Sequence, residues 1–414
     1  MTVSVQTIDD AAKRINGIAK NTPLQLNKRL SNLFGANVYI KREDLQRVRS
    51  YKIRGSYNLI KSLTKEGKKS GVVCASAGNH AQGVALSANE LKIHATIFIP
   101  IKTPLQKIER VKYFGGKWID IKLIGLTYDE SCNAALQFCK ENNAVFVHPF
   151  NDEQVISGQG TVGKEIFDEL GNNIDYVFVP IGGGGLVSGV STYLKNKIKH
   201  IKVIGLEPQG APSMLEALKK GKIVTLKVID TFVDGAAVRT VGDKTFPIVK
   251  RLVDEVLLVP EGKICTTMID LYQNEGIVTE PAGALSISAL DFLANKIKGK
   301  TVVCILSGGN NDILRYPEIM EKSLVYQGKK HYFLIEFAQK PGQLRQFVDK
   351  ALGPTDDIVR FEYIKKSAKE TGPALVGIEQ ASSKDFDRLK KKMKKLGINF
   401  KIITSSDLLY SYLV

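Results

Sequence analysis

The sequence predicts an α/β protein with two subdomains built on parallel or mixed sheets, followed by a smaller α+β module. Over most of the chain, strand-like apolar runs alternate with helical stretches, which is typical of parallel sheets. A length of 414 residues exceeds one ordinary core, so several domains are expected. From about residue 324 the pattern changes to β-α-β-β-α-β, the order of a ferredoxin-like module.

Composition narrows the class of protein. No apolar run approaches the length of a membrane span and the first residues carry no secretory signal pattern, so a cytoplasmic protein is expected. The five cysteines form no CxxC pair, which argues against a disulfide framework. The formal charge of +17 is spread along the chain with acids interleaved, so we expect neither nucleic acid nor a membrane as a partner.

The first elements lead to a lysine motif. Apolar spacing predicts a helix over 7–19, and 36–41 has the character of a short strand. The motif Ser50-Tyr51-Lys52-Ile53-Arg54-Gly55 then surrounds Lys52 with small and cationic neighbours. A helix is expected from Arg54 onward to residue 63. Lys52 would therefore lie at a helix N-terminus, where the dipole and partial burial favour a neutral amine.

A second motif, Ser76-Ala77-Gly78-Asn79-His80, follows the strand predicted at 71–75 and leads into a helix that reaches residue 91. Backbone amides exposed at such a turn suit a carboxylate. The alternative is an ordinary strand-to-helix turn in which Asn79 caps the helix. His80 is expected to support packing or the loop.

The parallel sheet continues through strands expected at 94–100, 117–121 and 144–149. The run Gly158-Gln159-Gly160-Thr161-Val162-Gly163 is then expected to open a helix from 164 to 170. A second α/β unit would begin soon afterwards.

Four consecutive glycines, Gly182-Gly183-Gly184-Gly185, follow the buried strand predicted at 175–180. Their amides can close on an anion without interference from side chains. A Walker A loop is excluded because no Gly-Lys-Ser/Thr follows, and a dinucleotide fingerprint fails because Val187 stands at its third glycine. A cup for a single phosphate fits better.

The last strand of the catalytic part, predicted at 301–306, ends in Ser307-Gly308-Gly309-Asn310. Before it, Glu280-Pro281 begins another helix, with the proline in the first turn. Ligands of open α/β sheets bind at the carboxyl ends of the parallel strands. The four motifs together supply what a pyridoxal phosphate (PLP) site needs. The lysine offers a Schiff-base amine, the turn after 71–75 a cradle for the ring and the carboxylate, the glycine run a phosphate cup, and the serine a partner for the pyridine nitrogen.

The C-terminal module has no catalytic constellation of its own. We expect a catalytic domain over 1–322, with a smaller subdomain at roughly 51–150, and the module over 330–414. Its strands are expected at 330–337, 358–362, 374–379 and 400–403, and its helices at 341–351 and from 384. Regulation by a small ligand, or oligomer contact, is the natural hypothesis.

In combination these residues resemble the fold-type II PLP enzymes, which share a tryptophan synthase beta-like fold, and among them the threonine dehydratase (threonine ammonia-lyase) family. The form resembled is the short one with a single ACT-like domain. The resemblance implies that Lys52 binds PLP and removes the α-proton of the substrate. It further implies that Asn79 meets the ring 3-oxygen, that Gly182–Gly185 with Leu186 bind the phosphate, and that Ser307 meets the pyridine nitrogen.

The same resemblance implies a substrate and an effector. The activity would be deamination of L-threonine to 2-oxobutanoate and ammonia, the first step of isoleucine biosynthesis. The residues that would bind the substrate are Ser76, Ala77, Gly78, Asn79 and His80. Isoleucine would be the effector, valine its possible antagonist, and the assembly a dimer or tetramer. The alternatives are a serine or threo-hydroxyamino-acid dehydratase and, from another class, a nucleotide-binding regulatory protein.

Two departures concern the related serine racemases. Ala77 stands where those enzymes carry a second serine, which argues against racemase activity. Their cation site would correspond to Glu207, the Ala211 carbonyl and position 213, but Ser213 replaces the acid there. No metal is therefore expected, with Glu207 and Ala211 as weak candidates.

Overall fold

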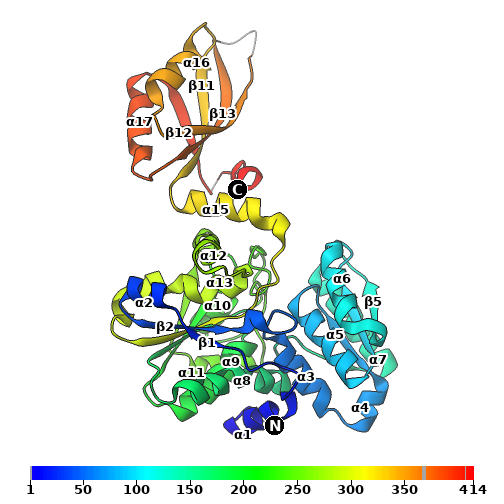
Figure 1. Cartoon of the computed structure of the whole chain (residues 1–414). Helices are drawn as coiled ribbons and strands as arrows, with labels where there is room; N and C mark the ends of the chain where they lie inside the picture. Colours follow the sequence, from blue (N-terminus) through cyan, green and yellow to red (C-terminus); the bar gives the residue numbers. More distant parts are fainter. Residues whose placement is uncertain (1, 366–369, 406) are drawn as a thin grey trace. The chain divides into compact units, whose positions relative to one another are not determined.

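The computed structural model describes residues 2–365, 370–405 and 407–414 as two compact units (Figure 1). The first unit comprises Met1–Glu261 with Leu271–Asn311, and the second comprises Gly262–Asp270 with Asp312–Val414. The domain boundary predicted at residue 322 stays a prediction. Within the described residues, no helix is long and apolar enough to cross a membrane.

A mixed six-stranded sheet forms the larger half of the first unit. Its order is β1-β2-β10-β7-β8-β9, with β1 antiparallel to β2 and every other neighbour parallel. The alternating pattern thus predicted the sheet type correctly. The strands are β1 (Leu24–Leu26), β2 (Asn37–Arg42), β7 (Tyr176–Pro180), β8 (Lys202–Pro208), β9 (Glu255–Val259) and β10 (Thr301–Leu306).

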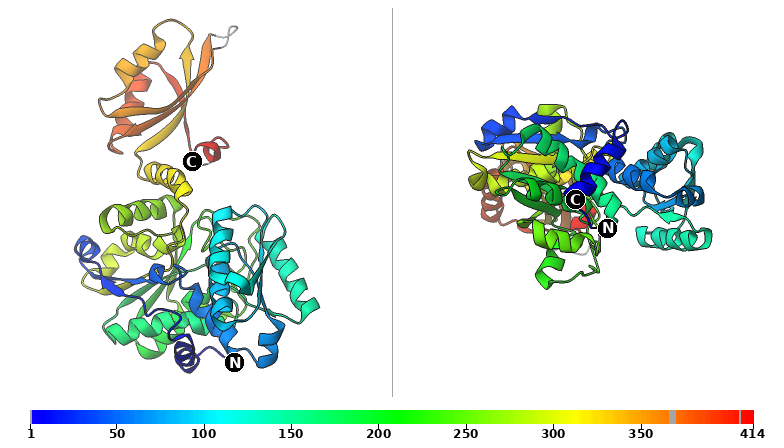
Figure 2. Two further views of the ribbon diagram at one scale, coloured as in Figure 1. Left: turned by 45° about the vertical axis from the view of Figure 1, so that its right-hand side comes forward. Right: turned by 90° about the horizontal axis from the view of Figure 1, so that it is seen from below.

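A second, fully parallel sheet forms the smaller half, in the order β5-β4-β3-β6. Val72 and Cys74 pack into one core and Val73 into another, because side chains alternate between the faces of a strand. Helices therefore cover both faces (Figure 2). The strands are β3 (Val72–Ala75), β4 (Ala95–Ile99), β5 (Ile119–Leu123) and β6 (Val145–Phe146).

Thirteen α-helices of the described residues lie wholly in the first unit, and α12 (Glu261–Glu275) contributes to both units. Those that carry or adjoin the predicted site motifs are α3 (Lys52–Ser62), α5 (Asn79–Leu91), α8 (Glu153–Leu170), α9 (Gly185–Lys197) and α13 (Pro281–Ser288). The others are α1 (Val5–Ile15), α2 (Lys28–Phe34), α4 (Lys65–Ser70), α6 (Leu105–Gly115), α7 (Tyr128–Asn142), α10 (Ser213–Lys220), α11 (Thr245–Leu252) and α14 (Ala294–Ile297).

Helix α8 begins at Glu153, so the start predicted after the glycine run was wrong. The Asp152 side chain caps the helix by accepting hydrogen bonds from two backbone amides. The glycines lie inside the helix because neighbouring elements approach closely. A Cβ at Gly158 would stand 2.4 Å from the Arg54 carbonyl oxygen, and one at Gly160 would stand 2.7 Å from Ile8. Glycine here marks close packing between helices and not a helix start.

A buried ion network fixes the start of α3. The Arg54 guanidinium, fully buried, donates to both Glu43 carboxylate oxygens at 2.8 Å and to both Glu165 oxygens at 2.5 and 2.8 Å. Lys41 Nζ lies 2.7 Å from Glu165 Oε2 and donates to the Thr22 carbonyl at 2.6 Å. The network therefore joins α3 to β2, to the turn that follows β2, and to α8.

The second unit carries an antiparallel sheet in the order β12-β13-β11-β14, which confirms the ferredoxin-like pattern. Its strands are β11 (Lys330–Ala338), β12 (Asp356–Tyr363), β13 (Thr371–Gln380) and β14 (Asn399–Ile403). Its helices are α15 (Tyr316–Tyr326), α16 (Gln343–Gln346), α17 (Asp385–Lys395) and α18 (Tyr410–Leu413).

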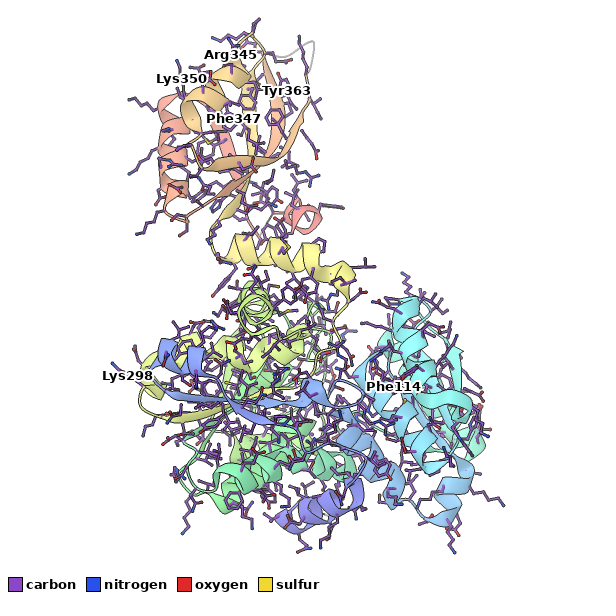
Figure 3. All side chains as sticks on the ribbon, viewed as in Figure 1. Phe114, Lys298, Arg345, Phe347, Lys350 and Tyr363 are labelled. Atoms are coloured by element: carbon purple, nitrogen blue, oxygen red, sulfur yellow. The ribbon has the colours of Figure 1, made fainter. Side chains whose placement is uncertain are left out.

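The helix predicted at 341–351 consists of two segments, because α16 passes into a π-helical turn at Phe347–Ala351. The Phe347 ring is fully buried and meets the Phe337 ring at 5.4 Å between centroids. Arg345 and Lys350 of the same segment are exposed at the surface (Figure 3).

The ion network generates a test of stability. Arg54→Met should lower the free energy of unfolding by about 3–5 kcal/mol, because it leaves the buried Glu43 carboxylate without its guanidinium partner, whereas Glu165 keeps Lys41. Equilibrium denaturation would measure the loss. The control is Arg47→Met, which removes a surface ion pair with Glu90 and should cost at most about 1 kcal/mol. Equal losses in the two variants would contradict a special role for the network.

Candidate active site

The lysine motif and the serine loop lie side by side. Ser50 and Gly308 form an isolated antiparallel bridge, and the Tyr51 amide donates to the Ser307 carbonyl at 3.2 Å. The Gly309 amide donates to the Arg49 carbonyl at 2.9 Å. Two motifs that are far apart in the sequence are thus joined by backbone hydrogen bonds.

Lys52 is the first residue of α3, which confirms its predicted place at a helix N-terminus. Its Nζ donates to the Pro149 carbonyl at 2.9 Å. Burial lowers the pKa of this amine to about 8, and the Glu280 carboxylate opposes that shift. A lysine with this pKa supplies neutral amine near neutral pH, as a nucleophile or base requires.

The second motif forms the start of α5, but Asn79 does not cap the helix. The N-cap is Gly78, and no side chain among the described residues caps the helix, so the first-turn amides remain available to an anion. Ser76 Oγ accepts from the Gly78 amide at 3.1 Å, which shapes the turn. Ala77 is half-buried at the centre of this turn.

His80 has a supporting role. Its Nε2 lies 2.8 Å from the Val147 carbonyl oxygen and the ring is buried. Burial, with a contribution from the positive charge of Lys52, lowers its pKa to about 3. A histidine that stays neutral and bound to the backbone fits the predicted role in packing.

The glycine run forms a closely packed loop before α9. Gly184 has φ +92°, a conformation that favours glycine, and a Cβ at Gly183 would stand 2.3 Å from the Phe150 ring. The Gly183 carbonyl accepts from Thr245 Oγ1 at 2.6 Å, which holds the loop. Helix α9 starts at Gly185, so its first-turn amides, including that of Leu186, lack helical partners and are suited to bind an anion.

The serine loop brings a further acid to the site. Ser307 is buried and its hydroxyl donates to the Ala282 carbonyl at 3.2 Å. The Glu280 carboxylate accepts from Asn79 Nδ2 with both oxygens, at 2.7 and 3.0 Å. Burial raises its pKa to about 7. From the sequence, Glu280 was expected only to begin a helix. A single acid within a long, mostly apolar stretch was the signal that could have indicated a functional role.

Comparison with known proteins identifies the family. Residues 15–308 match the family described as "Pyridoxal-phosphate dependent enzyme". The chain belongs to this family. Residues 321–413 match the "C-terminal regulatory domain of Threonine dehydratase". The two matches together agree with the resemblance drawn from the four motifs.

Individual relatives of this PLP enzyme cover its whole length. The chain is 50% identical to "L-threonine dehydratase biosynthetic IlvA" of Halalkalibacterium halodurans, over 100% of this chain and 99% of that one. The Bacillus subtilis protein of the same name is 48% identical over 100% and 98%.

Among solved structures, the processed form of threonine deaminase isoform 2 from Solanum lycopersicum is 39% identical, with a TM-score of 0.74 over 78% of this chain and 96% of that one. Maize serine racemase is 33% identical, with a TM-score of 0.72 over 79% and 99%. These likenesses support the fold-type II assignment of the PLP enzyme.

The residues of the site fit PLP. The loop at Gly182–Gly185 leaves no room for side chains, as a phosphate cup requires, and Lys52 supplies an amine of lowered pKa. Gln159 Oε1, beside Gly185, is buried and has no hydrogen-bond partner within the part of the chain that the structure describes. An unpartnered polar atom of this kind is expected beside the site of a polar ligand.

The two weak metal candidates have other partners. The Glu207 carboxylate accepts from the Met214 and Leu215 amides at 2.7 and 2.9 Å, and the Ala211 carbonyl accepts from the Ser213 amide at 3.0 Å. Burial raises the pKa of Glu207 to about 7, which further weakens it as an anionic ligand. These oxygens organise the first turn of α10, and we propose no metal there.

The lowered pKa of Lys52 generates a kinetic prediction. Covalent attachment of PLP to the protein should accelerate about tenfold per pH unit as the amine deprotonates, and should level off above about pH 8. The sign follows from the direction of the shift, since only the neutral amine attacks an aldehyde. Stopped-flow absorbance would measure it, with Nα-acetyl-lysine, whose side-chain amine is free, as the control. A rate that keeps rising to about pH 10 would show an ordinary lysine.

Proposed function

We propose that this protein is a PLP-dependent threonine ammonia-lyase, which converts L-threonine to 2-oxobutanoate and ammonia in the first step of isoleucine biosynthesis. The observation that carries the proposal is the full-length match, at 50% identity, to a relative named as a biosynthetic L-threonine dehydratase. The arrangement around Lys52 supports it, because the site offers an amine, an anion cup and a second anion-binding helix start.

The cofactor supplies an electron sink that stabilises negative charge at the substrate Cα. Lys52 would hold the cofactor through Nζ, and its free amine would take the Cα proton of the substrate. With a pKa of about 8, about one amine in ten is neutral at pH 7. Lys52 can therefore serve as the base without an additional partner.

The remaining residues orient the reactants. The amides at the start of α5, in the turn from Ser76 to His80, bind the substrate carboxylate. The Gly182–Gly185 loop and the Leu186 amide anchor the cofactor phosphate at the start of α9. Ser307 offers the ring nitrogen a neutral hydroxyl, which does not enforce its protonation as a carboxylate would. The weaker electron sink favours β-elimination over transamination.

Loss of the amine tests the assignment. Lys52→Ala should abolish formation of 2-oxobutanoate while the fold persists, because alanine retains the helix and removes only the reactive group. The violet-edge absorbance of a lysine-bound cofactor should vanish with it. Lys61→Ala, on the exposed end of the same helix, is the matched control and should keep full activity.

The same assay distinguishes the substrates. A pocket discriminates a single methyl group by only about 1–3 kcal/mol, so serine should also be dehydrated, with a lower kcat/KM than threonine. Retained turnover in Lys52→Ala would overturn the site assignment. Equal or better kcat/KM with serine would overturn the substrate assignment.

We further propose that the second unit binds isoleucine as a feedback effector, with valine as antagonist, in a homodimer or homotetramer. Its match to the regulatory domain of threonine dehydratase supports this role. A ligand regulates only if it binds the active and inactive states with different affinity. A coupling of about 1–3 kcal/mol would change the apparent affinity for threonine by about 5–150-fold.

The effector proposal predicts that isoleucine shifts the threonine saturation curve of the full chain to higher concentration. Valine should move the curve back toward its original position. Steady-state kinetics at fixed enzyme concentration would measure both shifts, with alanine as the control ligand. Superimposable curves with and without millimolar isoleucine would reject feedback control by this ligand.

A further inference from the structure

The Asn79 carboxamide is held at both ends by hydrogen bonds. Its Nδ2 donates to both oxygens of Glu280, and its Oδ1 accepts from Asn310 Nδ2 at 2.6 Å. The Asn310 amide also donates to the Val48 carbonyl at 2.7 Å. A continuous polar chain therefore runs from Glu280 through both asparagines to the backbone at Val48.

The two ends of this chain determine its direction. A carboxamide presents either its nitrogen or its oxygen to a neighbour after a half-turn, and its partners decide which. An ionised carboxylate and a backbone carbonyl can only accept. The Val48 carbonyl therefore requires the nitrogen of Asn310, which leaves the Asn79 oxygen to accept from Asn310. The Asn79 nitrogen is thereby turned toward the Glu280 oxygens, which accept from it.

The Glu280 carboxylate lies in a narrow slot. It is only 5% exposed, and a Cβ at Gly308 would stand 2.5 Å from its Oε1. A Cβ at Gly235 would stand 3.4 Å from the same atom. The Glu280 amide also donates to the Gly308 carbonyl at 3.2 Å, which holds the residue at the start of α13. The carboxylate is thus confined as well as buried.

We infer that Glu280 is a positioning residue, which fixes Asn79 so that its amide nitrogen and not its oxygen faces the PLP ring. An amide nitrogen carries two hydrogens. In the inferred geometry the two Glu280 oxygens share one of them and leave the other for the anionic ring 3-oxygen, whereas a flipped Asn79 would oppose that oxygen with its own carbonyl. The inference rests on the proposed contact of Asn79 with the ring.

The test uses the full chain loaded with PLP. Glu280→Met removes the acceptor at similar volume, and should raise the Kd of PLP in equilibrium dialysis by about 3–10-fold, the effect of one hydrogen bond, and shift the absorbance band of the bound cofactor. Glu280→Gln retains an acceptor oxygen and should recover part of the affinity. If Glu280 only filled space, Glu280→Gln and Glu280→Met would have the same Kd for PLP, because both side chains fill the slot.

A double-mutant cycle then tests the route through Asn79. If Glu280 acts by orienting Asn79, the double variant with Asn79→Ala should bind PLP no more weakly than Asn79→Ala alone. Additive losses, or an unchanged Kd in Glu280→Met, would overturn the inference. If Glu280→Met does not fold, Glu280→Gln takes its place in the cycle and the same two results decide.

Glu275→Gln is the matched control. Glu275 belongs to the same unit and pairs with Arg29 at 2.7 Å, so the substitution neutralises an acid that the site does not use. Its Kd for PLP should be unchanged, and a loss equal to that of Glu280→Met would overturn the inference. Absence of PLP binding by the unaltered chain would instead overturn the proposed function.

Discussion

The buried Arg54 guanidinium is the constraint on which the position of the active site depends. It is two residues beyond Lys52 in the same helix turn, and it forms hydrogen bonds to the buried Glu43 carboxylate and to the partly buried Glu165 carboxylate. A buried charge without its partner is costly, so this end of α3 has one favourable position. The position of Lys52 is fixed together with that of Arg54, because the helix is rigid over a single turn.

The site combines a backbone held by hydrogen bonds and close packing with side chains whose pKa values are shifted by burial. Backbone hydrogen bonds join the Lys52 turn to the Ser307 loop, and close contact with the Phe150 ring fixes the glycine loop. Burial lowers the pKa of Lys52 and raises that of Glu280, so both groups titrate near neutral pH. The two shifts have opposite signs but one cause, because burial disfavours the charged form of a base and of an acid alike.

The start predicted for α8 was wrong because of its glycines. The glycines at 182–185 and 308–309 were interpreted correctly, because they follow apolar strands and mark loops. Those within α8 were taken for a helix start, although they allow α1, α3 and α9 to approach. A single sequence does not distinguish a glycine needed for its backbone conformation from one needed for its small volume, since both replace a side chain with a hydrogen.

The order of the elements, the helix N-terminal place of Lys52, the glycine loop before α9 and the ferredoxin-like pattern of the second unit could all be predicted from the sequence. Each of these follows from residues close together in the chain, through apolar period, turn chemistry and helix termini. The contact of Asn79 with Glu280, 201 positions away, and that of Arg54 with Glu165, 111 positions away, could be found only in the folded structure. Burial and charge pairing depend on such distant neighbours, and so the pKa values and the partner of Asn79 became visible only once the chain was folded.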